Sequence, residues 1–217
     1  MSAALQLTTA GDSAAWEDRY EELAFTAFAL HTQIDDAALG KLFTEVQGVL
    51  ADWERIEADR RRIRGAAIAA RARVKVADSA LDLILQKLAE TLIAESDGQR
   101  GELYQRFFPE AHERVVALGL DGELPAASLV MAQLDEGGTV PDGLSIYIEP
   151  LRACLGLGNG ALAQRADGYA ELGRLAARVE AWLETADAVN RNVHADLTTL
   201  AEDRGLSARW VGSFFTR

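Results

Sequence analysis

The chain has 217 residues, of which 49% are hydrophobic and 26% are charged, and this composition is typical of a folded globular protein rather than a disordered one. The net charge of −12 argues against a general nucleic-acid binder, because phosphate contacts need a basic surface. Four prolines and an aromatic share of 7% favour helices rich in Ala and Leu over a β-sandwich.

The location that the sequence favours is the cytoplasm. Residues 1–12 show neither a basic start nor an apolar core, so we expect no secretory signal. Uncharged stretches such as residues 23–34 fall short of the roughly 20 residues that a membrane span needs. The single cysteine, Cys154, cannot form an internal disulfide, which is typical of a reducing compartment.

The first predicted helix covers residues 12–34, with Asp12 as its capping residue. Its apolar positions recur with steps of four and three, the period of one helix face: Trp16, Tyr20, Leu23, Ala27, Leu30 and Ile34. Phe25 and Phe28 lie outside this face, so we expect a second surface to cover them. That surface is either a side lobe of the same chain or another subunit.

The strongest pattern in the sequence follows, over residues 36–97, with Asp35 or Asp36 as a helix cap. Alternating steps of three and four select sixteen positions, of which fourteen are apolar; these are Leu39, Leu42, Val46, Val49, Trp53, Ile56, Arg60, Ile63, Ala67, Ala70, Val74, Ala77, Leu81, Ile84, Leu88 and Thr91. This heptad pattern predicts the seam of a coiled coil or bundle. We expect one continuous helix ending near Gly98, with a hairpin that turns at Gly65 as the alternative.

Residues 99–158 have a different texture, because they hold all four prolines and many of the glycines. Turn signals such as Leu120-Asp121-Gly122 divide the segment, which predicts short helices around 100–108, 110–118, 125–135 and 143–156. We expect this segment to form a side lobe on the bundle.

A second long helix is predicted to open at Asn159 and to stop at Gly205, before a short last helix capped by Ser207. Its seam includes one polar residue, Asn190, which either fixes helix register or lies at a wet end of the bundle. The predicted seam positions are Leu162, Arg165, Tyr169, Leu172, Ala176, Val179, Leu183, Ala186, Asn190, Val193, Leu197 and Leu200.

The fold class predicted from these elements is all-α: an elongated antiparallel helical bundle with long heptad-patterned helices and a short-helix insertion. One integrated domain is expected, with three parts. These are an N-terminal long-helix part (1–98), the short-helix side lobe (99–158), and a C-terminal long helix with a short terminal helix (159–217).

Searches for catalytic, cofactor or metal motifs give nothing specific. The three histidines, His31, His112 and His194, lack the partners at ligand spacing that a carboxylate-bridged or zinc site needs. Cys154 has no motif around it, and we expect its side chain to be a buried apolar part of the core. The glycines of 156–160 mimic a phosphate loop without its preceding strand or following Lys, so a helix connection is expected. We therefore expect no catalytic residue, no cofactor and no metal.

A basic band is the first feature that points to function. Residues 60–75 contain seven basic residues and no acid: Arg60, Arg61, Arg62, Arg64, Arg71, Arg73 and Lys75. The ordinary interpretation is a solvated helix surface paired with acidic neighbours. The functional one is a docking strip for an acidic partner, such as the acidic N-terminal region of a second copy, and Phe25 and Phe28 are candidates for the same role.

The second feature is residues 200–214, where Ala201, Gly205, Leu206, Val211 and Phe214 match a helix-turn-helix. Any helix-loop-helix with a Gly stop and a Ser cap has the same sequence pattern. The second helix also has few basic residues to contact DNA phosphates.

The function expected from the sequence is that of a non-enzymatic structural or adaptor protein that acts through protein–protein contacts and self-associates as a homodimer. The alternatives are a DNA-binding regulator that uses residues 200–214, or an unrecognised ligand-binding helical bundle.

Overall fold

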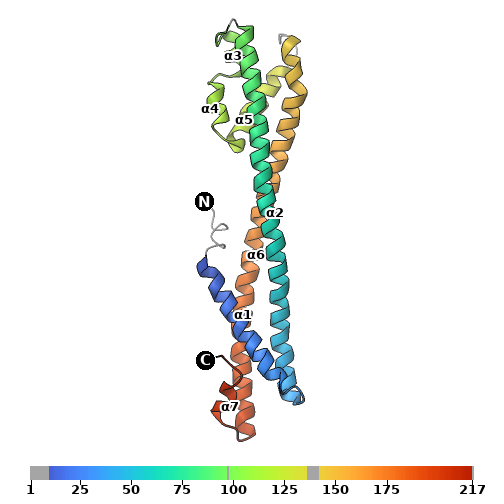
Figure 1. The fold of residues 1–217 in the computed structure, drawn as a ribbon, viewed down its shortest axis with the longest axis vertical. Helices are drawn as coiled ribbons and strands as arrows, with labels where there is room; N and C mark the ends of the chain where they lie inside the picture. Colours follow the sequence, from blue (N-terminus) through green and yellow to red (C-terminus); the bar gives the residue numbers. More distant parts are fainter. Residues whose placement is uncertain (1–9, 97, 136–141, 217) are drawn as a thin grey trace. The chain divides into compact units, whose positions relative to one another are not determined.

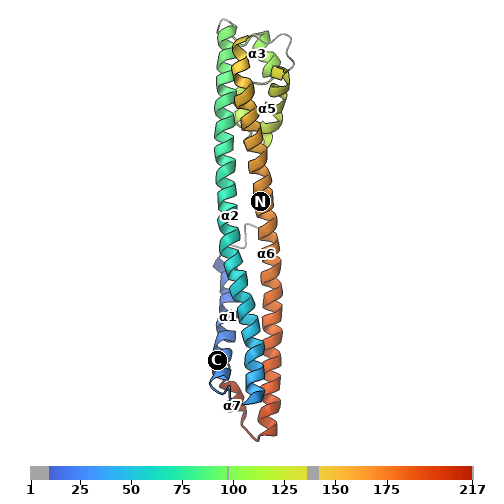
Figure 2. The ribbon, with the colours of Figure 1, turned by 90° about the vertical axis from the view of Figure 1, so that its right-hand side faces the viewer.

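The computed structural model describes residues 10–96, 98–135 and 142–216, and over these ranges it contains seven α-helices, one 3-10 helix and no strand. The predicted all-α helical bundle is confirmed (Figures 1 and 2). The helices are α1 Ala10–His31, α2 Ala37–Glu95, α3 Glu102–Phe107, α4 His112–Val116, α5 Leu120–Asp135, α6 Ile148–Asp203 and α7 Ala208–Gly212, with the 3-10 helix η2 at Asp142–Tyr147.

Helix α2 is continuous over its 59 residues, so the single-helix prediction is confirmed and the hairpin at Gly65 is wrong. At its start, Asp36 Oδ1 accepts a hydrogen bond from the backbone N–H of Ala38 at 3.0 Å, which satisfies one of the unpaired donors of a helix N-terminus. At its end, Gly98 takes a φ of +80° and its N–H donates to Ile93 O at 2.9 Å. That left-handed closure is the usual role of glycine after a helix.

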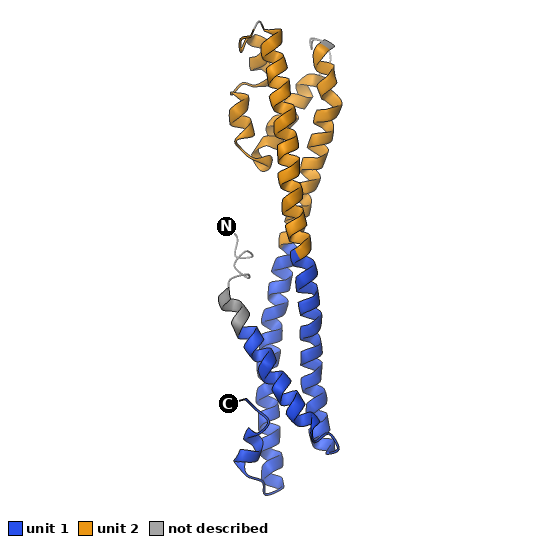
Figure 3. Cartoon of the chain, in the orientation of Figure 1, with its two compact units in different colours: residues 1–64, 170–217 blue, residues 65–169 orange. Residues whose placement is uncertain are grey.

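The chain divides into two compact units (Figure 3). Unit 1 comprises residues 1–64 and 170–217, and unit 2 comprises residues 65–169. Each unit has its own hydrophobic core. The predicted short-helix lobe, residues 99–158, falls within unit 2.

In unit 1, α1 and the antiparallel parts of α2 and α6 enclose a core of Leu, Val and Trp side chains. Three indoles from three helices stack in series: the ring of Trp53 lies 4.9 Å from that of Trp16 and 4.5 Å from that of Trp182. The Trp182 indole N–H donates to Val49 O at 2.9 Å, so its polar atom is satisfied inside the core. Val211 of α7 and Phe214, two residues after that helix, close this core.

In unit 2, the short helices pack on antiparallel parts of α2 and α6. The core includes Leu81, Leu85, Leu88 and Leu92 of α2, Tyr104 of α3, Phe108 just after it, and the apolar stripe of α5.

All sixteen predicted seam positions of α2 are buried or half-buried, none exposed. The heptad pattern therefore identified the inward face of α2 along its whole length.

The structure corrects several boundaries. Helix α1 begins at Ala10, so the prediction that Asp12 caps it is wrong. Gly119, with φ of +68°, separates α4 from α5, and the predicted turn at residues 120–122 is instead the first turn of α5. Ser207 stands at the N-cap position of α7, yet its side chain makes no capping hydrogen bond.

The largest correction concerns the start of the second long helix. It begins at Ile148 rather than Asn159, and the glycine-rich segment 156–160, expected to be a connection, lies inside it. The predicted seam is confirmed at Ala186, Val193 and Leu197, which are fully buried. Elsewhere the buried residue is the one before the predicted position, as at Ala161, Leu175 and Trp182. Tyr169, a predicted seam residue, is 36% exposed.

Close packing explains one of these helical glycines. A Cβ at Gly158 would lie 2.7 Å from Leu124 Cδ2 and 3.2 Å from Leu120 Cδ1 of α5, whereas one at Gly156 or Gly160 would meet nothing within 4 Å. The absence of a side chain at Gly158 lets α5 approach α6 closely.

These glycines give a matched set of substitutions. We expect Gly156→Ala or Gly160→Ala to raise the free energy of unfolding by about 0.5–1 kcal/mol, the helix preference for Ala over Gly. At Gly158 the same gain is opposed by overpacking against Leu124, which costs about 1–3 kcal/mol, so Gly158→Ala should be neutral or destabilising. Urea unfolding followed by far-UV circular dichroism measures all three. A gain at Gly158 equal to the other two would show that α5 does not pack there.

Candidate functional site

The N-terminal part of the basic band is engaged within unit 1. Arg60 Nε lies 3.1 Å from Glu57 Oε2, and its guanidinium stacks 4.6 Å from the ring centroid of Trp16. Arg61 also reaches Glu57, at 3.3 Å, and Arg62 reaches Asp59 at 3.1 Å. The pKa of Asp59 is lowered, first by its hydrogen bond from Arg178 of α6 and then by that from Arg62. These arginines follow the ordinary interpretation of a charge-paired helix surface.

The part of the band in unit 2 is different. Arg73 donates to Gln164 of α6. Arg71 and Lys75 have no ion pair among the described residues, and in unit 1 the same holds for Arg64. Arg71 and Lys75 line a shallow hollow of about 380 Å³ with Ala72 and Ile68, whose side chain is 58% exposed. We call Ile68, Arg71, Ala72 and Lys75 the basic strip.

The outer face of α1 carries the opposite charge. Steps of three and four select Asp18, Glu21, Phe25 and Phe28, all exposed, and Phe25 and Phe28 are 44% and 72% exposed. The inward face of the same helix buries Leu23, Ala27 and Leu30. We call the four outward residues the acidic–aromatic stripe.

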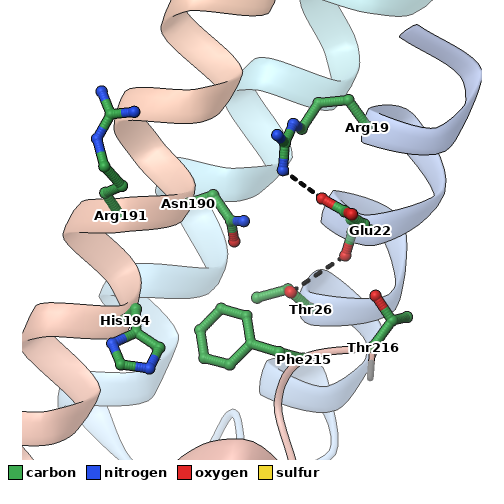
Figure 4. A pocket seen from close by; sticks show the side chains of 8 residues that line it. All are labelled: Arg19, Glu22, Thr26, Asn190, Arg191, His194, Phe215 and Thr216. Carbon is green, nitrogen blue, oxygen red and sulfur yellow. Dashed lines mark hydrogen bonds and ion pairs between the residues drawn. The ribbon is translucent and has the colours of Figure 1, made fainter. Parts of the chain in front are cut away.

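Unit 1 also contains an open polar pocket of about 390 Å³ between α1, α6 and the residues after α7 (Figure 4). Arg19 of α1 binds Glu22, and lies 2.7 Å from Asp187 of α6, so its charge is already balanced. Asn190 presents an Oδ1 atom that is buried without a hydrogen-bond partner among the described residues. In Figure 4, Arg191 extends away from Asn190. The lining also includes the hydroxyl of Thr26, which donates to Glu22 O at 3.1 Å within α1.

The histidines are occupied by structural contacts. The ring of His31 lies 5.1 Å from that of Phe43, and the ring of His194 lies 5.2 Å from that of Phe215. The Tyr104 hydroxyl accepts from the backbone N–H of His112 and lies 3.0 Å from its Nδ1. Among the residues that the structure describes, no group of three or more His, Cys, Asp or Glu side chains could hold a metal ion.

Residues 200–214, whose sequence matches a helix-turn-helix, cover one end of the core of unit 1. Gly205 has a φ of +62° and the N–H of Leu206 donates to Ala201 O at 2.8 Å, which confirms the predicted glycine stop. The following α7 has five residues, one of which, Arg209, is basic. Such a helix extends about 7.5 Å at 1.5 Å per residue, which leaves little length to read a groove.

One cluster was missed by sequence reasoning. Glu123 of α5 is fully buried in unit 2 and faces Asp78 and Asp82 of α2. A signal was present, because Glu123 stands on the apolar stripe of its helix, three residues after Leu120 and four before Ala127. An acid in such a position is rarely buried without a partner.

Comparisons with protein-family models, with curated proteins and with solved structures found no match. No helix in the described part of the chain combines the length and the apolar character that a membrane span requires.

Proposed function

We propose that this chain is a non-enzymatic structural or adaptor protein that acts through protein–protein contacts and associates with a second copy of itself. The observation that carries the proposal is the acidic–aromatic stripe of α1, where Phe28 is 72% exposed and Phe25 is 44% exposed. Aromatic side chains in heptad spacing on the outside of a helix are suited to packing against another helix.

Charge favours the basic strip of the second copy as the surface that packs against the acidic–aromatic stripe. The stripe offers two carboxylates and two phenyl rings, and the strip offers Arg71 and Lys75 beside Ile68 and Ala72. The two cations have no ion pair among the described residues, so they are free to meet Asp18 and Glu21. Both surfaces are single helix faces, which pack together by interdigitating side chains.

Apolar contacts and ion pairs would play different roles in this interface, because their contributions to the free energy of binding differ. Fully burying an exposed Phe is worth about 1.5–3 kcal/mol, of which Phe28, 72% exposed, would gain most and Phe25, 44% exposed, about half. Exposed ion pairs contribute about 0–1 kcal/mol each. The apolar contacts would therefore supply most of the affinity. The charges would select which faces pair, and their contribution should weaken as salt screens it.

The location that we propose is the cytoplasm. Cys154 is free and half-buried in unit 2, and a protein whose cores form without a disulfide is compatible with a reducing compartment.

Light scattering at micromolar concentration tests self-association. We expect a mass near 47 kDa, twice the 23.5 kDa of one chain, since two-fold dimers are the commonest assemblies. A mass of one chain over a broad concentration range would overturn the proposed function.

Substitutions then test the surfaces separately from self-association itself. Phe28→Ser should weaken the dimer at least about tenfold, because about 1.4 kcal/mol changes a dissociation constant tenfold. Leu129→Ser is the matched control, because Leu129 is 69% exposed on α5 and lies outside both surfaces. The pair Arg71→Glu and Lys75→Glu should also dissociate the dimer, and adding Asp18→Lys and Glu21→Lys should restore it. If none of these substitutions dissociates the dimer, the protein self-associates, but through other surfaces than these two.

A further inference from the structure

Unit 2 contains a buried carboxyl group to which the described residues give no ion pair. Glu123 of α5 has 0% of its surface exposed, and neither of its carboxyl oxygens receives a hydrogen bond from a donor group in the described residues. It faces Asp82 and Asp78 of α2, each of which also has one buried oxygen without a donor. From α6, the thiol of Cys154 lies close enough for the charge of Glu123 to raise its pKa, although burial is the larger cause.

Lys75 of α2, three residues before Asp78, makes no ion pair with this cluster among the described residues, and two arginines of α6 are bound to other acids. Arg165 of α6 binds Asp121, two residues before Glu123, with an N–O distance of 2.7 Å. Arg152 of α6 binds Asp135 at 3.1 Å, at the other end of α5. Both ion pairs tie the ends of α5 to α6, and neither reaches the acids at its centre.

Three facing carboxylates in a core would be strongly unfavourable, because burying an unpaired charge costs several kcal/mol and like charges repel. The arrangement becomes favourable when one carboxyl is protonated and donates a hydrogen bond to its neighbour. Burial, the charge of Asp82, the hydrogen bond with Asp82 and the charge of Asp78 together raise the pKa of Glu123 to about 8. The pKa of Asp82 is also raised, mainly by burial, against the effect of its hydrogen bond with Glu123.

We propose that Glu123 and Asp82 form a proton-binding site that makes the packing of α5 in unit 2 depend on pH near neutrality. In the protonated state the Glu123 carboxyl donates to the Asp82 carboxylate and joins α5 to α2. When the proton leaves to solvent, the carboxylates of Glu123, Asp82 and Asp78 repel one another, and the centre of α5 loosens. The ion pairs of Asp121 and Asp135 keep the ends of α5 attached, so the response is local.

The sign of the pH effect follows from proton linkage. The pKa of Glu123 in the folded protein lies above its ordinary value of 4.5, so the folded state binds this proton more tightly than the unfolded state does. The stabilisation is fully present below about pH 4.5 and is lost as the pH rises towards about 8. This direction is opposite to that of the carboxyl of Asp36, whose pKa is lowered to about 2, first by its hydrogen bond from Arg204.

Thermal unfolding followed by circular dichroism, between about pH 5 and about pH 9, tests the proposal. We expect the midpoint of the wild-type protein to fall by about 5 °C or more over this range. Glu123→Gln, which keeps the shape and cannot lose a proton, should largely remove that fall. Glu102→Gln is the control, because Glu102 is exposed on α3, and it should keep the wild-type profile. A flat wild-type profile, or an unchanged slope in Glu123→Gln, would overturn the proposal.

A direct titration covers the case in which Glu123→Gln does not fold. In protein carrying ¹³C-labelled glutamate, the side-chain carboxyl signal of Glu123 should titrate with an apparent pKa well above that of the other glutamates. Asp82→Asn removes the neighbouring charge and supplies a donor, and it should move this titration to lower pH. A Glu123 signal that titrates with the exposed glutamates would exclude the site.

Discussion

Replacing Leu81 with Asp should unfold unit 2 at neutral pH. Leu81 lies on the inward face of α2 with 0% of its surface exposed, and it is next to Asp82 in a region that already holds Asp78 and Glu123. An unpaired carboxylate there costs several kcal/mol, which is comparable with the total stability of about 5–15 kcal/mol of an ordinary domain. Ala70→Asp, at a position that is 5% exposed, should have the same effect.

Far-UV circular dichroism and thermal melting measure the loss, and Leu83→Asp is the control. Leu83 is two residues along the same helix and 53% exposed, so a carboxylate there stays in water. Wild-type melting of Leu81→Asp and Ala70→Asp would show that the heptad seam is not buried. Equal damage from Leu83→Asp would instead assign the effect to charge on α2 in general.

The second large effect is expected in unit 1, from Trp182→Ala. The Trp182 side chain is 4% exposed, stacks 4.5 Å from Trp53 and donates to Val49 O. Removing it leaves a cavity among three helices, and truncations of this kind cost about 3–5 kcal/mol.

Trp182→Phe separates packing from hydrogen bonding. The phenyl ring refills much of the volume, so its cost should be smaller, with the lost N–H bond contributing about 0.5–1.5 kcal/mol. Urea unfolding followed by circular dichroism is suitable, because it does not depend on the indole fluorescence that the substitutions remove. A loss in Trp182→Ala no larger than that in Trp182→Phe would contradict the stacked core.

The two proposals concern different side chains, exposed ones in the first and buried ones in the second, and they respond to different conditions. Contacts between the acidic–aromatic stripe and the basic strip should weaken with salt, because their charges are exposed. The Glu123 site is buried in unit 2, and salt screens buried charges much less. A pH response that persists at high salt therefore belongs to the core rather than to self-association.

The sequence by itself determined those features that depend on neighbours along the chain. The period of three and four from Leu39 to Thr91 identified the inward face of α2, because side chains at that spacing lie on one side of any helix. Gly98 and Gly205 marked helix ends, because a left-handed backbone costs a glycine little. The outward position of Phe25 and Phe28 followed from the same period, and both are exposed in unit 1.

Tertiary structure decided the features that depend on which helix lies opposite. Helix α6 runs through Gly156 and Gly160, although each helical glycine costs about 1 kcal/mol, because helix stability in a folded protein comes mainly from packing of the inward face. In the basic band, Arg60 and Arg62 pair with Glu57 and Asp59 of α2 itself. The contact of Arg73, in contrast, depended on Gln164 of α6 lying opposite. The meeting of Glu123 with Asp82 depended on the register of α5 against α2, which is set by contacts between segments distant in the chain, and no local period encodes it.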